Sequence, residues 1–531
     1  MSTPASTAPL VAAIRQVADP LDPDIRIELS APANPEHGDL ATPVAMGLAK
    51  SARRAPREIA AEVAAALEPL EVVERVEVAG PGFVNIVLAP RWFADAAAAI
   101  VAAGRTFGAG QASPAERIHL EFVSANPTGP LHVGHARHAA FGDSLGRILE
   151  FAGHTVHREF YVNDYGRQIE LFGQSVAARI DQGRGVDTPV PEDGYHGEYV
   201  VDLAREIGPG HEPATLQELA KGLMLERIKA DLERFRVRFD TYFSETSLQE
   251  SGAVADAIDR LVAAGDAYEK DGAIWFRTTA YGDEKDRVIR RADGTTTYIA
   301  PDIAYHLDKA ARGFDRLINV LGADHHGYLA RLRAVLAAGG YDPAMLEIPL
   351  IQLVSLVEGG EEKKMSKRAG TVVALSDLVD DIGVDAARFF LAQRANETAF
   401  DLDLQLAREQ SRENPVYYLQ YVHARACNIL ERVGEVSPAV PPTVEPQERA
   451  LVLTLAAWPE EIAEAERRRA PHRVVAYLIE LARDFHLFYE HCRVYDAPDD
   501  VKPFRVVLTK AVRSVMALAL DLLGVSAPER M

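Results

Sequence analysis

One stretch near residue 120 restricts the fold more than any other part of the sequence. Residues 118–122 alternate between apolar and polar, which is the pattern of a β-strand. A proline-containing turn follows at 126–130, apolar residues at helical spacing run to about residue 153, and residues 154–161 again have strand character. A strand, a helix and a second strand in this order form a crossover connection, so we predict a parallel sheet.

Strand and helix patterns alternate again from residue 297 to about 383. Between the two alternating parts, residues 177–275 have mostly helical patterns and are expected to form an insertion. We therefore predict an α/β domain over residues 113–404, built as a Rossmann-like parallel sheet with helices and one helical insertion.

Smaller domains are expected on both sides of this sheet. Residues 1–112 have mixed patterns, with a strand predicted at 25–29 and a hairpin at 72–88, and they indicate a small α+β domain. From residue 405 to 531 only helical patterns occur, which predict an all-α bundle.

Composition limits the class of protein without deciding it. The formal net charge of −21 disfavours a polyanionic partner, but nucleic acid responds to local clusters of Lys and Arg, and these occur at 50–57, 363–368 and 467–469. No run of about 18 apolar residues is present, so no membrane span is expected. The N-terminus lacks a basic start followed by an apolar core, and the chain has only two cysteines, so we expect a reducing cytoplasm.

The turn after the first strand contains the most informative motif, His132-Val133-Gly134-His135. Two histidines three residues apart at a helix start lie on one side of the helix, and the free N–H groups there suit a polyphosphate. Imidazoles can donate hydrogen bonds to phosphate oxygens, and a glycine lets a flat group approach the backbone. The spacing alone leaves two structural histidines, or half of a metal site, as open alternatives. Zinc is disfavoured, because no Cys is near and no Glu follows His132.

A second motif lies in residues 359–371, where glycines near both ends surround a cluster of cations. Such a loop can close over a nucleotide and neutralise phosphate charge in a transition state. Taken alone, the motif also fits a basic surface loop.

Together, the two motifs resemble the two signatures of class I aminoacyl-tRNA synthetases. Residues 132–135 are similar to the HIGH signature, and residues 364–368 are similar to KMSKS with Arg368 in the last place. Each motif follows a strand of the same predicted sheet. Because Arg can still meet a phosphate, we expect the exchange of the final Ser to be harmless.

The resemblance implies a catalytic role for two pairs of side chains. His132 and His135, with Gly134 between them, are expected to bind the ATP phosphates. Lys364 and Lys367 are expected to bind ATP and to stabilise the pentavalent phosphorus while a carboxylate attacks it. Positioning and charge then do the chemistry, with no covalent enzyme intermediate.

Within this class, essentially the whole chain resembles the arginyl-tRNA synthetases. The similarity is carried by residues 121–137, 161–168, 298–305, 322–328 and 524–529. It implies an arginine–tRNA ligase that activates arginine with ATP and Mg²⁺, releases pyrophosphate and transfers arginine to the 3′ end of tRNA.

The same resemblance implies that arginine is held by Glu121, Asn126, Tyr298 and Asp302. A guanidinium is a planar fork of five donors that requires carboxylates or carbonyl oxygens. Tyr298 and Asp302 are four residues apart, so both can face one pocket, and we assign the guanidinium to them and the α-amino group to Glu121 and Asn126. Without the family match, Asp302 also fits a simple helix cap.

The nucleotide side of the pocket is expected at residues 322–327, with Gly322, Asp324 and His325 binding ATP. An ordinary turn with a pair of metal-like histidines is the alternative for this segment. The resemblance implies no metal ion held by protein side chains.

The flanking domains resemble parts that bind tRNA. Residues 37–40 are similar to the N-terminal domain that contacts the outer corner of tRNA, and the bundle resembles an anticodon-binding domain. Tyr417, Tyr421 and Arg425 are the candidate base contacts, with core packing of the tyrosines left open. The expected partners are arginine and its tRNA isoacceptors, with no membrane, and the chain is expected to be a monomer.

Two other functions fit parts of the sequence. The first is a class I ligase for another amino acid, which Glu121 and Asp302 disfavour because an apolar substrate does not require two carboxylates. The second is a non-catalytic RNA-binding relative, which loss of the His or Lys signatures would mark. All four of these residues are present.

Overall fold

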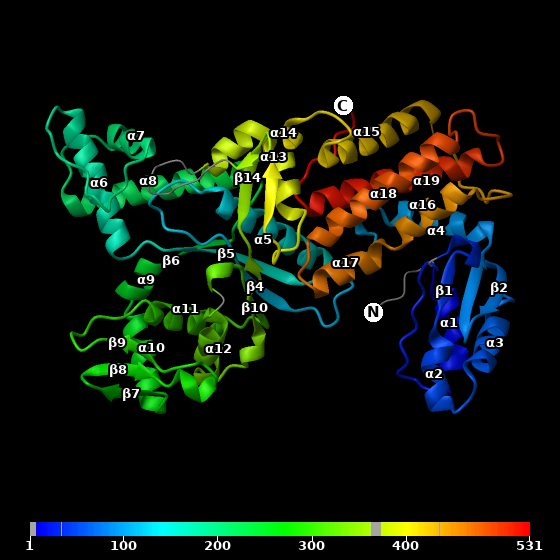
Figure 1. Cartoon of the computed structure of the whole chain (residues 1–531), viewed down its shortest axis with the longest axis horizontal. Helices are drawn as coiled ribbons and strands as arrows, with labels where there is room; N and C mark the ends of the chain where they lie inside the picture. The colour runs from blue at the N-terminus through cyan, green and yellow to red at the C-terminus, as the bar shows by residue number, and fades with distance from the viewer. Residues whose placement is uncertain (1–6, 33, 326, 363–372, 435) are drawn as a thin grey trace.

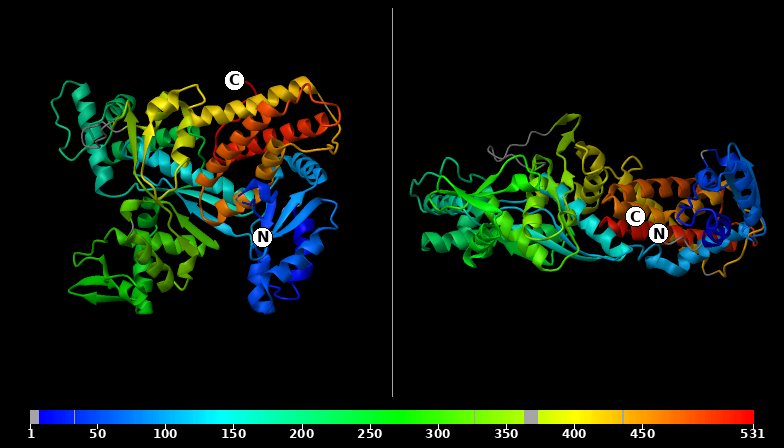
Figure 2. Two further views of the ribbon diagram at one scale, coloured as in Figure 1. Left: turned by 45° about the vertical axis from the view of Figure 1, so that its right-hand side comes forward. Right: turned by 90° about the horizontal axis from the view of Figure 1, so that it is seen from below.

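The computed structural model describes residues 7–531 except 33, 326, 363–372 and 435. Figure 1 shows a helical bundle that touches an N-terminal domain on one side and a central α/β domain on the other. Seen from below in Figure 2, the molecule is elongated, with the N-terminal domain at one end and the helices α6 to α8 toward the other. Among the described residues, no helix is both long and apolar enough to cross a membrane.

The N-terminal domain is an antiparallel sheet covered by helices, in the strand order β1-β3-β2. The hairpin predicted at 72–88 is confirmed by β2 and β3. The strand predicted at 25–29 is wrong: this segment only reaches a single bridge, between Ser30 and Ala41. The neighbouring strand β1 is three residues long and offers too short an edge for a further strand. The elements are α1 (Ala8–Ala18), β1 (Leu40–Thr42), α2 (Val44–Ala52), α3 (Pro56–Leu67), β2 (Val73–Ala79), β3 (Phe83–Leu88) and α4 (Pro90–Ala103).

The central domain contains the predicted parallel sheet. Its five strands lie in the order β12-β10-β4-β5-β6, and every neighbouring pair is parallel. Helix α5 (Val133–Ala152) makes the crossover between β4 and β5 that the pattern near residue 120 predicts. The α/β fold class is therefore confirmed. The strands are β4 (Arg117–Glu121), β5 (Thr155–Val162), β6 (Thr241–Ser244), β10 (Arg316–Asn319) and β12 (Leu346–Glu347).

Short strands extend this sheet past its carboxyl edge, and helices cover both faces. Strand β11 pairs with β13, and β14 pairs with β15 and β16. In Figure 1, α5 and α13 lie on one side of the sheet and α11 and α12 on the other. The elements are α11 (Ile299–Ala311), β11 (Leu321–Gly322), α12 (Tyr328–Ala338), β13 (Leu350–Ile351), β14 (Val354–Glu358), β15 (Glu361–Glu362), α13 (Leu375–Ala392), β16 (Phe400–Asp403) and α14 (Leu404–Arg408).

The stretch 177–275, predicted to be mostly helical, contains a strand of the central sheet. Helices α6 to α8 come first, and the chain then returns to the sheet as β6, which pairs with β5. Strand β6 is four residues long, too short to give a clear alternating pattern between two helices. The elements are α6 (Arg167–Gly183), α7 (Glu198–Ile207), α8 (Pro213–Arg234), α9 (Glu245–Glu250), α10 (Ala253–Ala264), and the antiparallel strands β7 (Ala267–Lys270), β8 (Ala273–Phe276) and β9 (Arg287–Arg290).

The C-terminal part is the all-α bundle that the sequence predicts. Its buried residues follow helical spacing, for example Leu478, Leu481 and Phe485 on one helix. The helices are α15 (Pro415–Val433), α16 (Pro446–Ala456), α17 (Trp458–Arg467), α18 (His472–His491) and α19 (Lys502–Leu522).

A buried arginine joins the bundle to the central domain. Arg388 of α13 donates to Asp143 Oδ2 on α5 at 2.6 Å, to the Leu523 carbonyl at 2.7 Å and to the Phe235 carbonyl at 3.0 Å. Its guanidinium lies against Gly524, where a Cβ would be 2.3 Å from Arg388 Nε and where φ is +67°. Only glycine fits there. Three segments far apart in the sequence are thereby locked around the helix that begins at the histidine turn.

Candidate active site

The predicted site lies at the carboxyl edge of the parallel sheet. Glu121, Asn319 and Ser244 are the last residues of β4, β10 and β6. In open parallel sheets, ligands bind beyond the carboxyl ends of the strands. The side chains that follow these three strands are therefore the candidates for ligand contacts.

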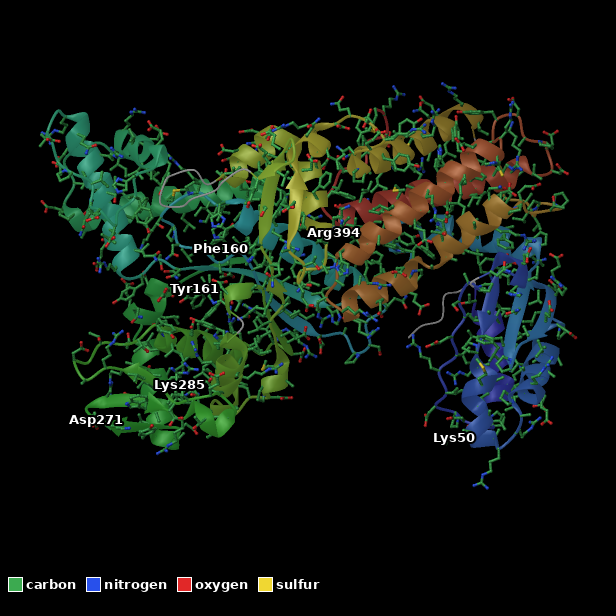
Figure 3. The ribbon with its side chains drawn as sticks, viewed as in Figure 1. Lys50, Phe160, Tyr161, Asp271, Lys285 and Arg394 are labelled. Carbon is green, nitrogen blue, oxygen red and sulfur yellow. The ribbon has the colours of Figure 1, made fainter. Side chains whose placement is uncertain are left out.

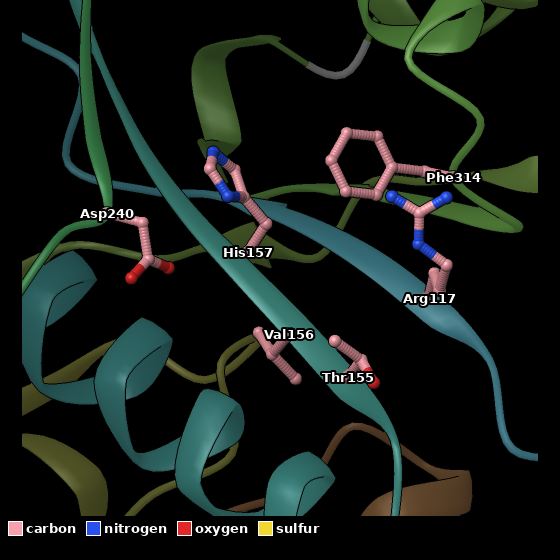
Figure 4. Close-up of a pocket in the computed structure, with 6 residues that line it drawn as sticks. All are labelled: Arg117, Thr155, Val156, His157, Asp240 and Phe314. Atoms are coloured by element: carbon pink, nitrogen blue, oxygen red, sulfur yellow. The ribbon is translucent and has the colours of Figure 1, made fainter.

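A cavity of about 340 Å³ lies at the opposite end of the strands. Figure 4 shows its lining side chains, and two of them, Arg117 and Thr155, are the first residues of β4 and β5. None of the side chains predicted from the sequence lines it. The candidate active site is therefore built from the side chains at the carboxyl edge.

The two histidines of the turn cap helix α5. The His132 backbone N–H donates to His135 Nδ1 at 3.2 Å, and the Gly134 N–H donates to His132 Nδ1 at 3.1 Å. Because both Nδ1 atoms accept a hydrogen bond, each neutral ring carries its proton on Nε2. The ring centroids are 3.9 Å apart, and the ring planes are tilted by 31°. In this tautomer Nε2–H is the donor group of each ring, and such donors at a helix N-terminus suit phosphate oxygens.

Gly134 makes room for the His132 ring itself. A Cβ at Gly134 would lie 2.9 Å from His132 Cε1 and 3.1 Å from His132 Nδ1. The sequence predicts that a flat ligand group approaches this glycine, and in the structure the flat group beside it is the neighbouring imidazole.

The described residues that follow the lysine motif lie next to this turn. Lys364 and Lys367 lie in the segment 363–372, outside the described residues. After this segment, the Leu375 N–H donates to the Leu131 carbonyl at 2.7 Å, and His132 forms a bridge with Ala374. Residues 374 and 375 are therefore attached to the histidine turn.

The turn predicted to bind nucleotide lies near the same helix. A Cβ at Gly322 would be 2.6 Å from Asp324 Oδ1, and the His325 ring packs edge-on against Tyr328 at 4.9 Å. Charged groups of both turns act on His138 of α5. Burial and the charges of Arg137 and His132 lower the pKa of His138 to about 4, and the charge of Asp324 opposes this shift. The sequence analysis did not identify His138, although it continues the spacing of three after His135.

Glu121 is buried and already has partners. Its Oε2 accepts from Lys309 Nζ at 2.8 Å, and its Oε1 accepts from Ser124 Oγ at 2.9 Å. Lys309 is fully buried on α11. Glu121 is thus fixed in position, with its charge balanced inside the protein.

Asp302 and Glu245 form the pair of carboxylates without a balancing cation. Burial and the charges of Glu121 and Glu245 raise the pKa of Asp302 to about 7. Burial and Asp164 raise the pKa of Glu245 to about 7, against a hydrogen bond from Tyr161. Among the described residues, neither carboxylate has a Lys or Arg at ion-pair distance. Two partly buried carboxylates that repel each other favour the binding of a cation.

Aromatic rings form the wall beside these carboxylates. Tyr161 packs against Tyr305 at 4.6 Å and is stacked with Phe243 at 6.1 Å. Figure 3 shows Tyr161 near helices α9 and α11, which begin at Glu245 and just before Asp302. Flat rings beside two carboxylates suit a planar cation.

The other two predicted arginine contacts lie differently. The Tyr298 residue is 67% exposed at the start of α11, and its hydroxyl oxygen accepts from Arg331 Nη1 at 3.4 Å. Asn126 Nδ2 donates to the Asn163 carbonyl at 3.0 Å, which ties the turn after β4 to the end of β5. The charge of Glu121 raises the pKa of Asp302, whereas Tyr298 is mostly exposed and its hydroxyl group contacts Arg331.

Sequence reasoning missed Glu245, which lies in the stretch predicted to be a helical insertion. The available signal was its place directly after a strand of the central sheet, and that strand was too short to recognise. Lys309, His306 and Asn319 were also missed, because an isolated Lys, His or Asn in a helix or strand carries no motif.

The predicted base-contacting residues lie on α15 in a cluster of Tyr and Arg side chains. The Arg425 guanidinium lies over the Tyr421 ring at 5.3 Å and over the Tyr489 ring of α18 at 4.8 Å. Tyr417 and Tyr421 are both partly exposed. We call Tyr421, Arg425 and Tyr489 the bundle patch.

The N-terminal motif at 37–40 serves the protein's own structure. Asp39 Oδ2 accepts from the Leu88 N–H at 2.7 Å and from Arg449 Nη1 of the bundle at 2.8 Å. Gly38 has φ of +110°, and a Cβ there would be 2.7 Å from the Ile86 carbonyl oxygen. This motif therefore joins the N-terminal domain to the bundle.

The described residues hold no group of three or more His, Cys, Asp or Glu side chains arranged for a metal ion.

The family models that match the chain divide it into the same three parts. Residues 7–88 match the arginyl-tRNA synthetase N-terminal domain, and residues 98–191 and 199–408 match the catalytic domain of class I (R) tRNA synthetases. Residues 419–531 match the DALR anticodon-binding domain.

Individual proteins agree with these matches. The chain is 46% identical over 522 residues to the arginine–tRNA ligase of Shouchella clausii, covering 95% of this chain and 94% of that one. It is 44% identical over 525 residues to that of Bacillus subtilis, with coverage of 95% and 94%. The structure of Thermus thermophilus arginyl-tRNA synthetase superposes with a TM-score of 0.78 at 25% identity, over 98% of this chain and 99% of that one.

A synthetase named for a different amino acid shares the fold. A methionyl-tRNA synthetase from Mycobacterium tuberculosis superposes with a TM-score of 0.54 at 16% identity, over 77% of this chain and 91% of that one. The sheet, the histidine turn and the catalytic-domain match together define a class I aminoacyl-tRNA synthetase. Within that class, the chain belongs to the arginyl-tRNA synthetases.

The position of the His132 ring gives a first prediction. Gly134→Ala is expected to push this ring aside and to lower kcat for ATP–pyrophosphate exchange by up to about 100-fold, because misplacing a catalytic group by about 1 Å has an effect of that size. Gly222→Ala is the matched control, since a Cβ at this exposed helical glycine meets nothing within 4 Å. Equal activity of the two variants would contradict the assignment of His132 to the phosphates.

Proposed function

We propose that this arginine–tRNA ligase binds arginine between Glu121 at one end and the Asp302–Glu245 pair at the other. The observation that carries the proposal is the pair of carboxylates that have no basic partner among the described residues. A guanidinium placed between them balances both charges and can donate to both. Glu121, fixed by Lys309 and Ser124, is available at the end of β4 for the α-amino group.

The reaction has two balanced steps. In the first, an oxygen of the arginine carboxylate attacks the α-phosphorus of ATP, the bond to the bridging oxygen of the β-phosphate breaks, and pyrophosphate leaves. In the second, a ribose hydroxyl at the 3′ end of tRNA attacks the arginyl carbonyl carbon, AMP leaves, and the hydroxyl proton passes to solvent.

The histidine turn is proposed to bind the phosphates in the first step. The Nε2–H groups of His132 and His135 would donate to oxygens whose charge grows as pyrophosphate departs. Gly322, Asp324 and His325 would border the nucleotide. Mg²⁺ is proposed to arrive on the ATP phosphates, as part of the substrate.

Lys364 and Lys367 are proposed to add positive charge on the same side of the phosphates. The attachment of residues 374 and 375 to the histidine turn supports this placement. Both motifs would then act on one phosphate group from two directions.

We further propose that the bundle patch, with Tyr417 beside it, contacts unpaired bases of tRNA. Partly exposed rings with a guanidinium stacked on them suit splayed bases. A cytoplasmic monomer is proposed as the working form. Cys427 and Cys492 are both free, which supports a reducing compartment.

ATP–pyrophosphate exchange with each of the twenty amino acids, with and without tRNA, tests the pocket. Arginine alone should support exchange. Asp302→Asn should lower kcat/KM for arginine by at least about 100-fold, since two charge-assisted hydrogen bonds at about 1.5–3 kcal/mol each are weakened, while the KM for ATP stays within about twofold.

Asp308→Asn on the same helix is the matched control. Asp308 is 3.2 Å from Arg312 and 43% exposed, so it is outside the pocket. A KM for arginine that is unchanged in Asp302→Asn, or raised equally in both variants, would remove Asp302 from the pocket.

The raised pKa values of Asp302 and Glu245 predict that the KM for arginine depends on pH. In the empty pocket, both carboxyls titrate near pH 7. Arginine stays cationic and favours their ionised forms, so its binding releases protons and strengthens as pH rises. The KM for arginine should fall between pH 6 and 8, by up to about tenfold per pH unit for each proton released.

Steady-state exchange at several pH values checks this dependence, with the KM for ATP as the internal reference. Glu245→Gln should make the slope shallower, because one titrating group is lost. A KM for arginine that does not vary with pH, or that rises with pH, would contradict the paired arrangement of the two carboxyls.

The bundle patch predicts an effect confined to tRNA. Tyr421→Ala should lower kcat/KM for tRNA by about 5- to 100-fold, the effect of losing about 1–3 kcal/mol of stacking on one base. Tyr268→Ala is the control, because Tyr268 also lies under an arginine, Arg277 at 4.4 Å, but belongs to β7. Aminoacylation at varied tRNA concentration measures both, and equal effects would refute a base contact at Tyr421.

A further inference from the structure

A continuous row of hydrogen bonds lies beneath the pocket and connects its two ends. Lys309 Nζ is 2.8 Å from Glu121 Oε2 and 3.0 Å from Asn319 Oδ1. Asn319 Nδ2 is 2.8 Å from His306 Nε2, and His306 Nδ1 is 2.8 Å from the Asp302 carbonyl oxygen. We call Lys309, Asn319 and His306 the relay.

The donors and acceptors of the relay allow one direction only. A carbonyl oxygen only accepts, so His306 Nδ1 must donate to Asp302. The neutral ring then accepts at Nε2 from the Asn319 amide, and the Asn319 carbonyl accepts from Lys309. Burial and the charge of Lys309 lower the pKa of His306 well below its ordinary value, which keeps the ring neutral, as this direction requires.

The three side chains of the relay are almost completely buried. Lys309, Asn319 and His306 are 0%, 2% and 3% exposed. Lys309 also lies 4.2 Å from the Tyr305 ring centroid, so a second face of the ammonium group is covered. Buried polar groups that are fully satisfied hold one arrangement, because any shift leaves a buried group without a partner.

The relay crosses between elements that carry opposite ends of the substrate. Glu121 ends strand β4, Asn319 ends the neighbouring strand β10, and His306 and Lys309 lie on α11, one and two turns after Asp302. Strands β4 and β10 are themselves paired in register. The first turn of α11 is therefore held at a set distance from the end of β4.

We propose that Lys309, Asn319 and His306 are positioning residues that set the length of the arginine pocket and so select the side-chain length of the amino acid. This proposal rests on the proposed function, in which Glu121 holds the α-amino group and Asp302 holds the guanidinium. None of the three residues need touch arginine. They act by keeping the two carboxylates one arginine length apart.

Length selection matters for this substrate because charge alone does not provide it. Any amino acid with a guanidinium satisfies Asp302 and Glu245, whether its side chain is longer or shorter than that of arginine. A difference of one methylene changes binding in a pocket by about 1–3 kcal/mol, provided that the pocket does not adjust its length. A rigid connection between the two ends provides this condition.

The test compares arginine with homoarginine, which is one methylene longer, in ATP–pyrophosphate exchange with tRNA present. Wild-type enzyme should prefer arginine by about 10-fold or more in kcat/KM. Asn319→Leu removes the acceptor of Lys309 and the donor to His306. It should lower kcat/KM for arginine by about 10-fold or more and reduce the preference over homoarginine to a few-fold, with the KM for ATP unchanged.

Two further variants separate positioning from general damage. Asn319→Asp has nearly the same volume, keeps the acceptor for Lys309 and loses the donor to His306. It should therefore also reduce the preference for arginine. This variant provides the test if Asn319→Leu does not fold. Asp308→Asn weakens the ion pair of Asp308 with Arg312 at 3.2 Å on the same helix as His306 and Lys309, outside the relay and the pocket, and should keep the wild-type preference.

The outcomes distinguish the relay from the pocket. Lower activity with an unchanged preference in a folded Asn319 variant would contradict the proposed role of the relay. A merely structural loss would affect the use of both amino acids equally. A wild-type enzyme without preference for arginine over homoarginine would overturn it as well. If Asp302→Asn leaves the KM for arginine unchanged, the pocket assignment itself fails.

Discussion

The ion pair between Glu121 and Lys309 is the constraint on which the pocket depends. It joins β4 to α11 at 2.8 Å inside the protein, and a second pair, between the buried Glu159 and the partly exposed Arg312 at 2.7 Å, joins β5 to the end of the same helix. Two carboxylates on neighbouring parallel strands thus hold one helix through two cations. Because breaking a buried pair costs several kcal/mol, the helix has little freedom to shift along the sheet. Asp302 on its first turn is placed by this attachment.

The proposed site separates its charges according to the two substrates. At the proposed arginine end, Asp302 and Glu245 have no Lys or Arg at ion-pair distance among the described residues, and their pKa values are raised first by burial and then by neighbouring carboxylates. At the nucleotide end, the helix N-terminus and the histidine turn present donors to phosphate. The carboxylates would repel a phosphate group, and the positive helix N-terminus would repel a guanidinium. The overall charge of −21 says little about either end, because binding responds to the field at the site.

Contacts between the parts of the molecule are buried and specific, and they explain two motifs that look functional. Arg388 connects α5, the segment after α8 and the end of α19, with Gly524 leaving room for its guanidinium. Asp39 connects the N-terminal domain to Arg449 of the bundle. The histidine turn begins the helix that Arg388 holds. These contacts hold the bundle patch and the carboxyl edge of the sheet in fixed positions relative to each other.

By itself the sequence determined the local features: the crossover near residue 120, the helix start at His132, the hairpin at 72–88 and the helical bundle. Periodicity and capping act over a few residues, so they can be recognised from neighbours in the chain. The family resemblance added the arginine contacts, and Asp302 and Glu121 do lie within electrostatic reach of each other. Only the tertiary structure decided that residues 25–29 form no strand, that β6 joins the central sheet, and that the charge of Glu245 acts on Asp302. It also decided that Glu121 is balanced by Lys309, 188 positions further along the chain. Such pairings depend on which distant elements meet, and the burial that gives a carboxylate or an amide its role exists only once they have met.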